Sequence, residues 1–109
     1  MNYVYILKCA DNTLYTGYTN NIPNRLKTHN LGKGAKYTRA RLPVTLIYFE
    51  QYESNVEAQK REFYIKKHLK RAQKQELIDS AQIGYKCITK DKITYAQIGG
   101  ELIEITNLQ

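Results

Sequence analysis

A chain of 109 residues is long enough for one small domain, and its 42% hydrophobic and 25% charged residues are ordinary for a globular protein and exclude a disordered one. No apolar run approaches the roughly 20 residues of a membrane-spanning helix, and the start of the chain lacks the basic leader and long apolar stretch of a secretory signal. Cys9 and Cys87 are too few and too far apart for a metal cluster or a disulfide framework. We therefore expect a cytoplasmic protein with reduced thiols and no membrane partner.

The net charge of +7 is confined to the first part of the chain. Residues 1–80 hold 14 Lys and Arg against 7 Asp and Glu, whereas residues 81–109 hold three of each and are neutral. A positive field of this kind favours a polyanion, most simply nucleic acid, and we expect DNA rather than RNA. The change in composition also predicts a domain over residues 1–80 and an extension of unknown role over residues 81–109.

Two adjacent strands are predicted at the start of the chain. Residues 2–8 are rich in β-branched and aromatic side chains, residues 10–12 favour a turn, and residues 13–18 read as the returning strand. Tyr5 and Tyr15 both have odd numbers, so any hairpin register with an even residue sum places them on one face of the sheet. A shift of one residue would separate them.

A short helix is predicted next, ending at about residue 29. Residues 19–21 offer N-caps, and Pro23 suits the first turn. Arg25 and His29 are four residues apart in this helix and therefore share one stripe of its surface.

Residues 31–43 are predicted to form a basic loop, with Gly32 and Gly34 for flexibility. Clustered cations with an interleaved aromatic residue suit phosphate contacts and base stacking, although an exposed solubilising loop would have the same composition. The candidate nucleic-acid-binding residues in this loop are Lys33, Lys36, Tyr37, Arg39 and Arg41.

The apolar run at residues 44–49 predicts a buried central strand. The capping box at residues 54–57 then opens a second helix, with an apolar stripe that we expect to include Val56, Phe63 and Ile65.

Glu62 and Lys66 lie four apart on this helix. Lys66 is a further candidate for binding nucleic acid, although it and the neighbouring cations Lys67, Lys70 and Arg71 are equally well explained as a solvated helix end. We assign no role to His68. A third helix is predicted over residues 72–79.

Alternating apolar residues on both sides of Gly99-Gly100 suggest a β-hairpin in the extension, which must pack on the domain or on a second copy of the chain. The protein is accordingly expected to be a monomer, or a homodimer formed through residues 81–109. The order ββαβα plus a further helix predicts an α+β fold, a small three-stranded antiparallel sheet flanked by helices, with a possible C-terminal β-hairpin extension.

Several of these residues, in this order, resemble the motifs of the GIY-YIG nuclease family, most closely its small single-domain bacterial branch. They are Tyr3-Val4-Tyr5, Tyr15-Thr16-Gly17, Arg25 with His29, and Glu62 followed by Ile65 and Lys66. The match covers roughly residues 2–80. It departs from the family at Tyr3, which replaces a glycine, and at Thr16, which replaces an isoleucine, and we expect both changes to affect strand packing more than the reaction.

The resemblance implies metal-assisted hydrolysis of a phosphodiester with one divalent ion, Mg²⁺ or Mn²⁺. Tyr5 would then accept a proton from water, Tyr15 would position water and phosphate, and Arg25 would bind the scissile phosphate. His29 would hydrogen-bond or relay a proton at Tyr5, and Glu62 would hold the metal.

Elementary chemistry is compatible with these roles. Because a free tyrosine titrates near ~10, a tyrosinate base needs nearby positive charge, which Arg25, His29 and the metal would supply. The planar fork of arginine matches two phosphate oxygens. One carboxylate suffices for Mg²⁺, which keeps several of its waters. Gly17 is expected to have a structural role, a close approach of the backbone.

Each residue alone also has an ordinary explanation. A strand tyrosine is usually a packing residue, Arg25 and His29 suit a helix surface, and Glu62 among lysines suits an i,i+4 ion pair. We therefore consider three functions: an endonuclease with little sequence specificity, a nucleic-acid-binding module with a weak or inactive site, and an accessory protein that dimerises through residues 81–109. Glu62 separates the first two, because an acid in a basic groove repels phosphate unless a cation lies between them.

Overall fold

The computed structural model describes residues 1–79, together with the backbone of residues 86–90, 93–98 and 101–105. Its elements, in chain order, are β1 (Asn2–Lys8), β2 (Leu14–Thr19), α1 (Ile22–Asn30), α2 (Lys36–Arg39), β3 (Thr45–Tyr52), α3 (Asn55–His68), α4 (Arg71–Asp79), β4 (Lys86–Lys90), β5 (Ile93–Ile98) and β6 (Glu101–Ile105). The predicted α+β class and its order of elements are confirmed, and the short helix α2 stands where a loop was predicted.

The strands that carry the site form an antiparallel sheet with β1 in the centre. Strand β1 pairs with β2 on one side and with β3 on the other, as the three-stranded prediction requires. In the β1–β2 hairpin, Tyr5 pairs with Gly17 and Leu7 pairs with Tyr15. The residue sums are even, so Tyr5 and Tyr15 lie on one face, as their numbering predicts.

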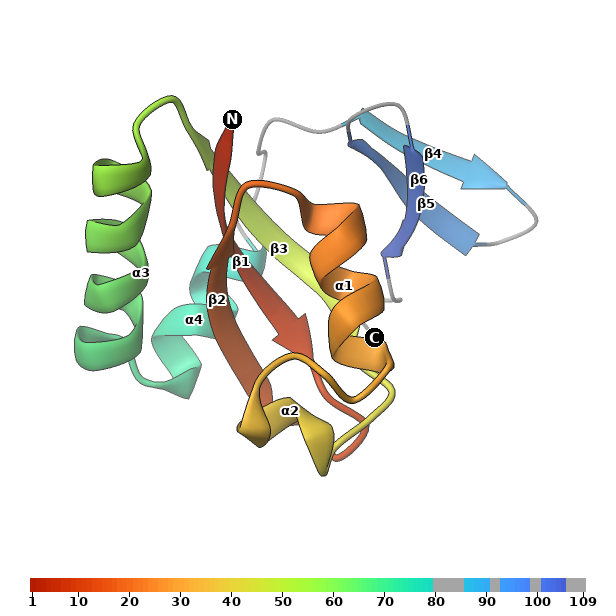
Figure 1. Ribbon diagram of the computed structural model, residues 1–109, viewed down its shortest axis with the longest axis horizontal. Coiled ribbons are helices and arrows are strands. Elements are labelled where there is room, and N and C mark those ends of the chain that lie inside the picture. Colours follow the sequence, from red (N-terminus) through yellow and green to blue (C-terminus); the bar gives the residue numbers. More distant parts are fainter. Residues whose placement is uncertain (80–85, 91–92, 99–100, 106–109) are drawn as a thin grey trace.

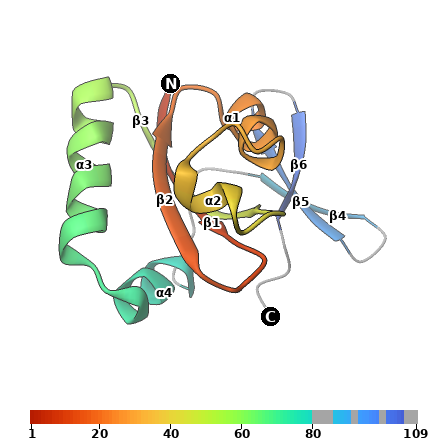
Figure 2. The same ribbon diagram turned by 60° about the horizontal axis from the view of Figure 1, so that its bottom comes forward.

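The sheet has a core on each face, because successive side chains of a strand point in opposite directions. Tyr5 and Leu7 pack with Ile22 of α1, whereas Val4 packs with Ala58 and Ile65 of α3. Figures 1 and 2 show α1 and α3 on opposite sides of the β1–β2 hairpin, with α2 beside α1 and α4 beyond the end of α3. None of the described helices is long and apolar enough to cross a bilayer.

Capping residues set the beginnings of α1 and α3. The side chain of Asn21 accepts a hydrogen bond from the backbone N–H of Asn24, and Ser54 accepts one from that of Glu57. These contacts confirm the starts predicted for α1 and α3.

The apolar stripe predicted for α3 was partly wrong. Ile65 and Ala58 face the sheet and are completely buried, but Val56 and Phe63 are 56% and 60% exposed. A short Ala58 side chain lets the helix approach β1 closely, so the side of α3 that carries Ala58 and Ile65 packs on the sheet and leaves Val56 and Phe63 in solvent.

The two changed positions of the family motifs are packing residues. Tyr3 lies edge-on to Phe49, with ring centroids 5.8 Å apart. Thr16 is 2% exposed, and it faces away from Tyr5 because its strand neighbours Tyr15 and Gly17 face toward that side.

In the C-terminal part, β5 and β6 pair antiparallel, as the predicted hairpin requires, and β4 is an additional strand that the sequence did not indicate. The expected turn at Gly99-Gly100 lies outside the described residues. Strand β6 continues the sheet beyond β3, with which it runs parallel, and within the described residues Leu46 pairs with Ile105.

Candidate active site

Two tyrosines form the floor of the candidate site. The ring centroids of Tyr5 and Tyr15 lie 6.4 Å apart. Tyr5 is 2% exposed, whereas Tyr15 is half-buried. The missing side chain of Gly17 makes room for the Tyr5 ring, because a Cβ at this position would lie 2.4 Å from Tyr5 Cζ. Gly17 therefore has the close backbone approach that its place in the sequence suggested.

His29 reaches this floor from the last turn of α1 and is completely buried. Its Nε2 lies 2.8 Å from Tyr5 Oη, and its Nδ1 lies 2.9 Å from Thr38 Oγ1 in α2. The Thr38 hydroxyl donates its own proton to the carbonyl of Ala35, at 3.0 Å. It must therefore accept a hydrogen bond from Nδ1–H, which leaves Nε2 unprotonated and able to accept the Tyr5 hydroxyl proton.

Tyr5 and His29, which share the 2.8 Å hydrogen bond, are both uncharged at neutral pH. Burial is the main cause that raises the pKa of Tyr5 to about 12, against the opposing hydrogen bond from Arg25. Burial, followed by the charge of Arg25, lowers the pKa of His29 to about 4. The expectation that His29 supplies positive charge to a tyrosinate was therefore wrong, because a desolvated imidazole stays neutral beside a guanidinium.

Arg25 supplies the positive charge of the site. Its Nε donates a 3.4 Å hydrogen bond to Tyr5 Oη, one helical turn from His29. Within residues 1–79, the ion pairs are Arg41 with Asp11, Arg61 with Glu50, and Lys66 with Glu62. No carboxylate of that part of the chain neutralises Arg25, which leaves its guanidinium available to a phosphate.

Glu62 comes to the same side of the molecule from α3. Its Oε2 lies 3.1 Å from Lys66 Nζ, which in turn lies 5.6 Å from the centroid of the Tyr15 ring. Glu62 is also close enough to Tyr5 for its charge to contribute to the raised pKa of that phenol. The fold thus gathers the other four predicted catalytic residues around Tyr5.

The donor set suits one hard cation. Within the described residues there is no group of three or more His, Cys, Asp or Glu that could hold a metal ion. The side chain of Glu62 is 22% exposed, so its oxygens reach solvent, and its present cation partner is the ammonium group of Lys66. One carboxylate with access to water fits Mg²⁺, which binds through one or two carboxylates and keeps several waters.

The residues of the predicted basic loop have separate positions. Tyr37 stacks on Tyr15, with centroids 6.1 Å apart at 23°, and extends the aromatic floor. Arg41 lies 3.9 Å above the Tyr37 ring and pairs with Asp11 at 3.0 Å, which fixes the loop to the hairpin. The other three cations are exposed: Lys33, Lys36 and Arg39.

Gly34 and Thr38 were missed as site residues by the sequence analysis. A Cβ on Gly34 would lie 2.3 Å from His29 Nδ1, so this glycine permits a close approach and was wrongly assigned to flexibility. Thr38 fixes the His29 ring. The sequence of the loop does not indicate that Gly34 and Thr38 contact His29, because both contacts depend on how the loop folds over α1.

The comparisons with known proteins place this site in a family. The model of the GIY-YIG catalytic domain matches residues 1–76. The chain belongs to the GIY-YIG family. The matched segment of this GIY-YIG chain contains all five predicted catalytic residues, and the family is one of nucleases.

Relatives of this GIY-YIG chain are small bacterial proteins of the UPF0213 group. A UPF0213 protein of Clostridium perfringens is 64% identical over 83 residues, which cover 76% of this chain and 88% of the relative. One from Staphylococcus haemolyticus is 55% identical over 72% of this chain and 94% of its own length. The solution NMR structure of a protein from E. faecalis, 43% identical, has a TM-score of 0.51 and covers 72% of this chain and 83% of that one. The matched part of this GIY-YIG chain therefore has the same fold as the E. faecalis protein.

Proposed function

We propose that this protein is an endonuclease that uses a divalent ion, Mg²⁺ or Mn²⁺, to hydrolyse phosphodiester bonds in DNA or structured nucleic acid. The observation that carries the proposal is the position of Tyr5 Oη, 2.8 Å from His29 Nε2 and 3.4 Å from Arg25 Nε. A phenol held between an imidazole acceptor and a guanidinium can receive a proton on one side and release one on the other.

The proton path follows from the tautomer of His29. Tyr5 is a neutral phenol at pH 7, so it accepts the proton of an attacking water only as its own proton moves to His29 Nε2. Thr38 keeps that nitrogen free by holding the Nδ1 proton. The roles proposed from the resemblance then fit together: Tyr5 is the immediate proton acceptor and His29 is the relay behind it.

Two groups would supply positive charge to the phosphate, the guanidinium of Arg25 and a divalent ion held by Glu62. Arg25, which no carboxylate of residues 1–79 neutralises, presents its guanidinium to the phosphate oxygens. Tyr15 with Tyr37 gives the aromatic floor on which the substrate rests. Glu62 would hold the divalent ion, exchanging its contact with Lys66. When bound, such an ion makes a coordinated water more acidic and stabilises charge on the phosphoryl oxygens.

The net charge of +7 and the exposed Lys33, Lys36 and Arg39 support binding through phosphates. Phosphate contacts carry no sequence information. We therefore propose action with little intrinsic sequence specificity and an affinity that falls steeply with salt.

One observation favours the second candidate, a nucleic-acid-binding module with an inactive site. Lys66 already neutralises Glu62 at 3.1 Å, which would allow the acid to lie near phosphate without a metal. This module would bind nucleic acid through the same cations and would not cleave it.

A cleavage assay with matched variants separates the two candidates. Supercoiled plasmid, branched DNA and RNA are each incubated with purified protein, with and without Mg²⁺ or Mn²⁺. The endonuclease nicks only with metal, and Glu62→Gln and Tyr5→Phe each reduce the rate at least 10²-fold while binding is kept. The controls are Glu57→Gln, an exposed acid of the same helix, and Tyr3→Phe, a phenol of the same strand. Binding without cleavage in any metal would establish the module, and equal cutting by the variants would place the activity elsewhere.

A further inference from the structure

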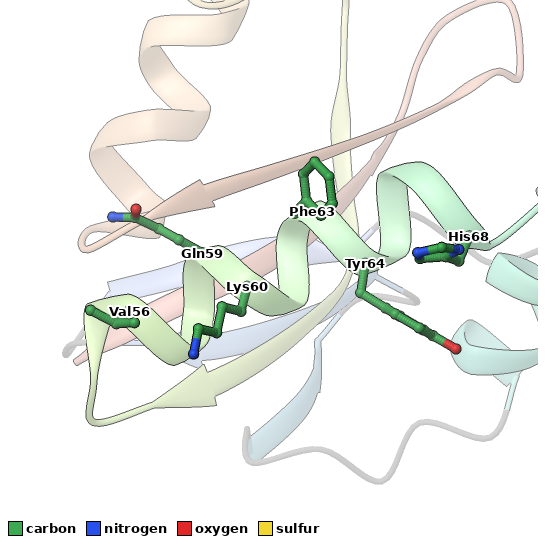
Figure 3. A pocket seen from close by; sticks show the side chains of 6 residues that line it. All are labelled: Val56, Gln59, Lys60, Phe63, Tyr64 and His68. Atoms are coloured by element: carbon green, nitrogen blue, oxygen red, sulfur yellow. The ribbon is translucent and has the colours of Figure 1, made fainter.

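The side of α3 that faces away from the sheet carries aromatic residues in solvent. Phe63 is 60% exposed and Tyr64 is 47% exposed, and Val56 is 56% exposed at the other end. Figure 3 shows these side chains spread along the helix. Together with their neighbours they line an open hollow of about 460 Å³. We call this surface the outer face of α3, and the residues that line the hollow are Val56, Gln59, Lys60, Phe63, Tyr64 and His68.

A cationic side chain lies near each of the two aromatic rings of the outer face, Phe63 and Tyr64. Lys67 Nζ lies 5.3 Å from the centroid of Phe63, and Arg61 Cζ lies 5.6 Å from that of Tyr64. The His68 ring packs against Tyr64, with centroids 5.0 Å apart. Among the described residues, none that lines the hollow is acidic. Arg61 is neutralised by Glu50, so the positive charge of this surface comes from Lys60 and Lys67. The surface therefore combines π-faces with positive charge, which is complementary to an anion that carries planar groups.

The outer face is continuous with the candidate active site. Lys66 contacts both Glu62 and the Tyr15 ring of the candidate site. Phe63 lies three residues before Lys66 on the same helix, so the two side chains are neighbours on its surface. Figures 1 and 2 show α3 at one side of the molecule and β4–β6 at the other, so the described part of the chain leaves this face open. A strand bound at Tyr5 and Glu62 has a direct route over Lys66 to Phe63.

We propose that the outer face of α3 binds unpaired nucleotides of the nucleic acid engaged by the active site. One base stacks on Phe63 and a second on Tyr64, with phosphates at Lys60 and Lys67. This rests on the proposed function for its ligand, but binding on α3 needs neither the metal nor cleavage. Its consequence is a preference for substrates in which single-stranded nucleotides adjoin the bond at the active site.

A protein helix is a poorer occupant of this surface. A helix-binding face requires a continuous apolar stripe, and here the polar residues Gln59 and Lys60 separate Val56 from Phe63. A second copy of the chain would bring Lys60 and Lys67 toward the same residues of its partner, in a protein that already carries +7.

A fluorescence titration tests the stacking. The chain contains no tryptophan, so Phe63→Trp introduces a single reporter at the proposed contact. A thymidine oligonucleotide, added in EDTA, is expected to quench its emission, and an abasic oligonucleotide of equal length and charge to bind roughly tenfold more weakly. Equal affinities for the two oligonucleotides would overturn the proposal, because phosphate contacts alone would then account for binding.

Variants of the same position separate stacking from other kinds of contact. Phe63→Leu keeps an apolar side chain and Phe63→Ala removes it, and each is expected to bind the thymidine strand roughly tenfold more weakly than wild type. Leu31→Ala, at an apolar residue that is 71% exposed and away from α3, is the control and should bind like wild type. Circular dichroism at matched urea concentrations verifies that the variants are folded.

The outcomes keep this inference distinct from the proposed function. Full binding by Phe63→Ala would overturn the α3 site and leave the cleavage assay unaffected. Binding of polyglutamate that is as tight as that of the thymidine strand, and equally dependent on Phe63, would identify an acidic protein ligand and refute the nucleotide site. A protein that never cleaves but stacks the thymidine strand on Phe63 would retain the α3 site as part of a binding module.

Discussion

Two buried polar networks flank the sheet, and they differ in charge. On the α1 side, Tyr5, His29 and Thr38 form a chain of neutral hydrogen bonds. On the α3 side, the carboxylate of Glu50, 8% exposed, accepts two hydrogen bonds from Arg61 at 2.9 and 3.0 Å. The hydroxyls of Tyr48 and Tyr52 also donate to Glu50.

This difference distinguishes a structural network from one that can move a proton. Both Glu50 oxygens are fully engaged, and the cluster joins β3 to α3 one residue before Glu62. In the neutral chain, the Tyr5 oxygen can still receive a proton while its own moves to His29. A charged pair would fix the proton in place, whereas neutral partners of matched geometry allow it to shift.

The largest expected effect is at Glu50. Glu50→Gln leaves the half-buried Arg61 guanidinium without its counter-ion and should lower the free energy of unfolding by roughly 3–5 kcal/mol in urea denaturation. The matched control is Asp11→Asn, which breaks the exposed pair with Arg41 and should leave the urea midpoint nearly unchanged. Similar losses in both variants would show that the α3-side network contributes no more than a surface ion pair.

The pH dependence of stability should separate the two networks. The pKa of His29 falls from 6.5 to about 4 on folding. Between these two pH values the imidazole is therefore protonated in the unfolded chain and neutral in the folded chain. Stability should therefore decline as the pH drops from about 6.5 toward 4, by on the order of 3 kcal/mol in full. Burial would raise the pKa of Glu50, but hydrogen bonds from Arg61, Tyr48 and Tyr52 hold it below its ordinary value. Its contribution is thus lost only as the pH falls below about 4.3.

Urea midpoints measured between pH 7.5 and 3.5 test this order. His29→Gln should abolish the decline above pH 4.3, and Glu50→Gln should keep it. If the urea midpoint of His29→Gln declines with falling pH above pH 4.3 as steeply as that of wild type, then folding does not lower the pKa of His29.

A smaller effect is expected at Thr38. Thr38→Val keeps the shape of the side chain but removes the acceptor for Nδ1–H, so His29 can take the other tautomer and cleavage should slow roughly tenfold. Thr38→Ser should restore the rate. The ¹⁵N NMR shifts of the His29 ring report the tautomer directly, and a Thr38→Val protein that is slow but retains Nδ1–H would contradict the positioning role.

The parts of the site that depend on local periodicity were predictable. The common face of Tyr5 and Tyr15 follows from the two-residue repeat of a strand, and the shared stripe of Arg25 and His29 follows from the helical repeat. Glu62 was placed in the site by its order among the family motifs, and the structure brings it to the others from across the edge of β2. The Glu50 cluster was missed because its partner Arg61 lies on another element.

The sequence by itself determined the order of the elements, their caps and the face of each strand, since these depend on neighbours along the chain. Tertiary structure alone decided the charge of His29, the tautomer set by Thr38, the close approach at Gly34 and the exposure of Phe63. Each of these depends on which distant atoms displace water from a side chain, and desolvation is a property of the packed molecule that no short stretch of sequence encodes.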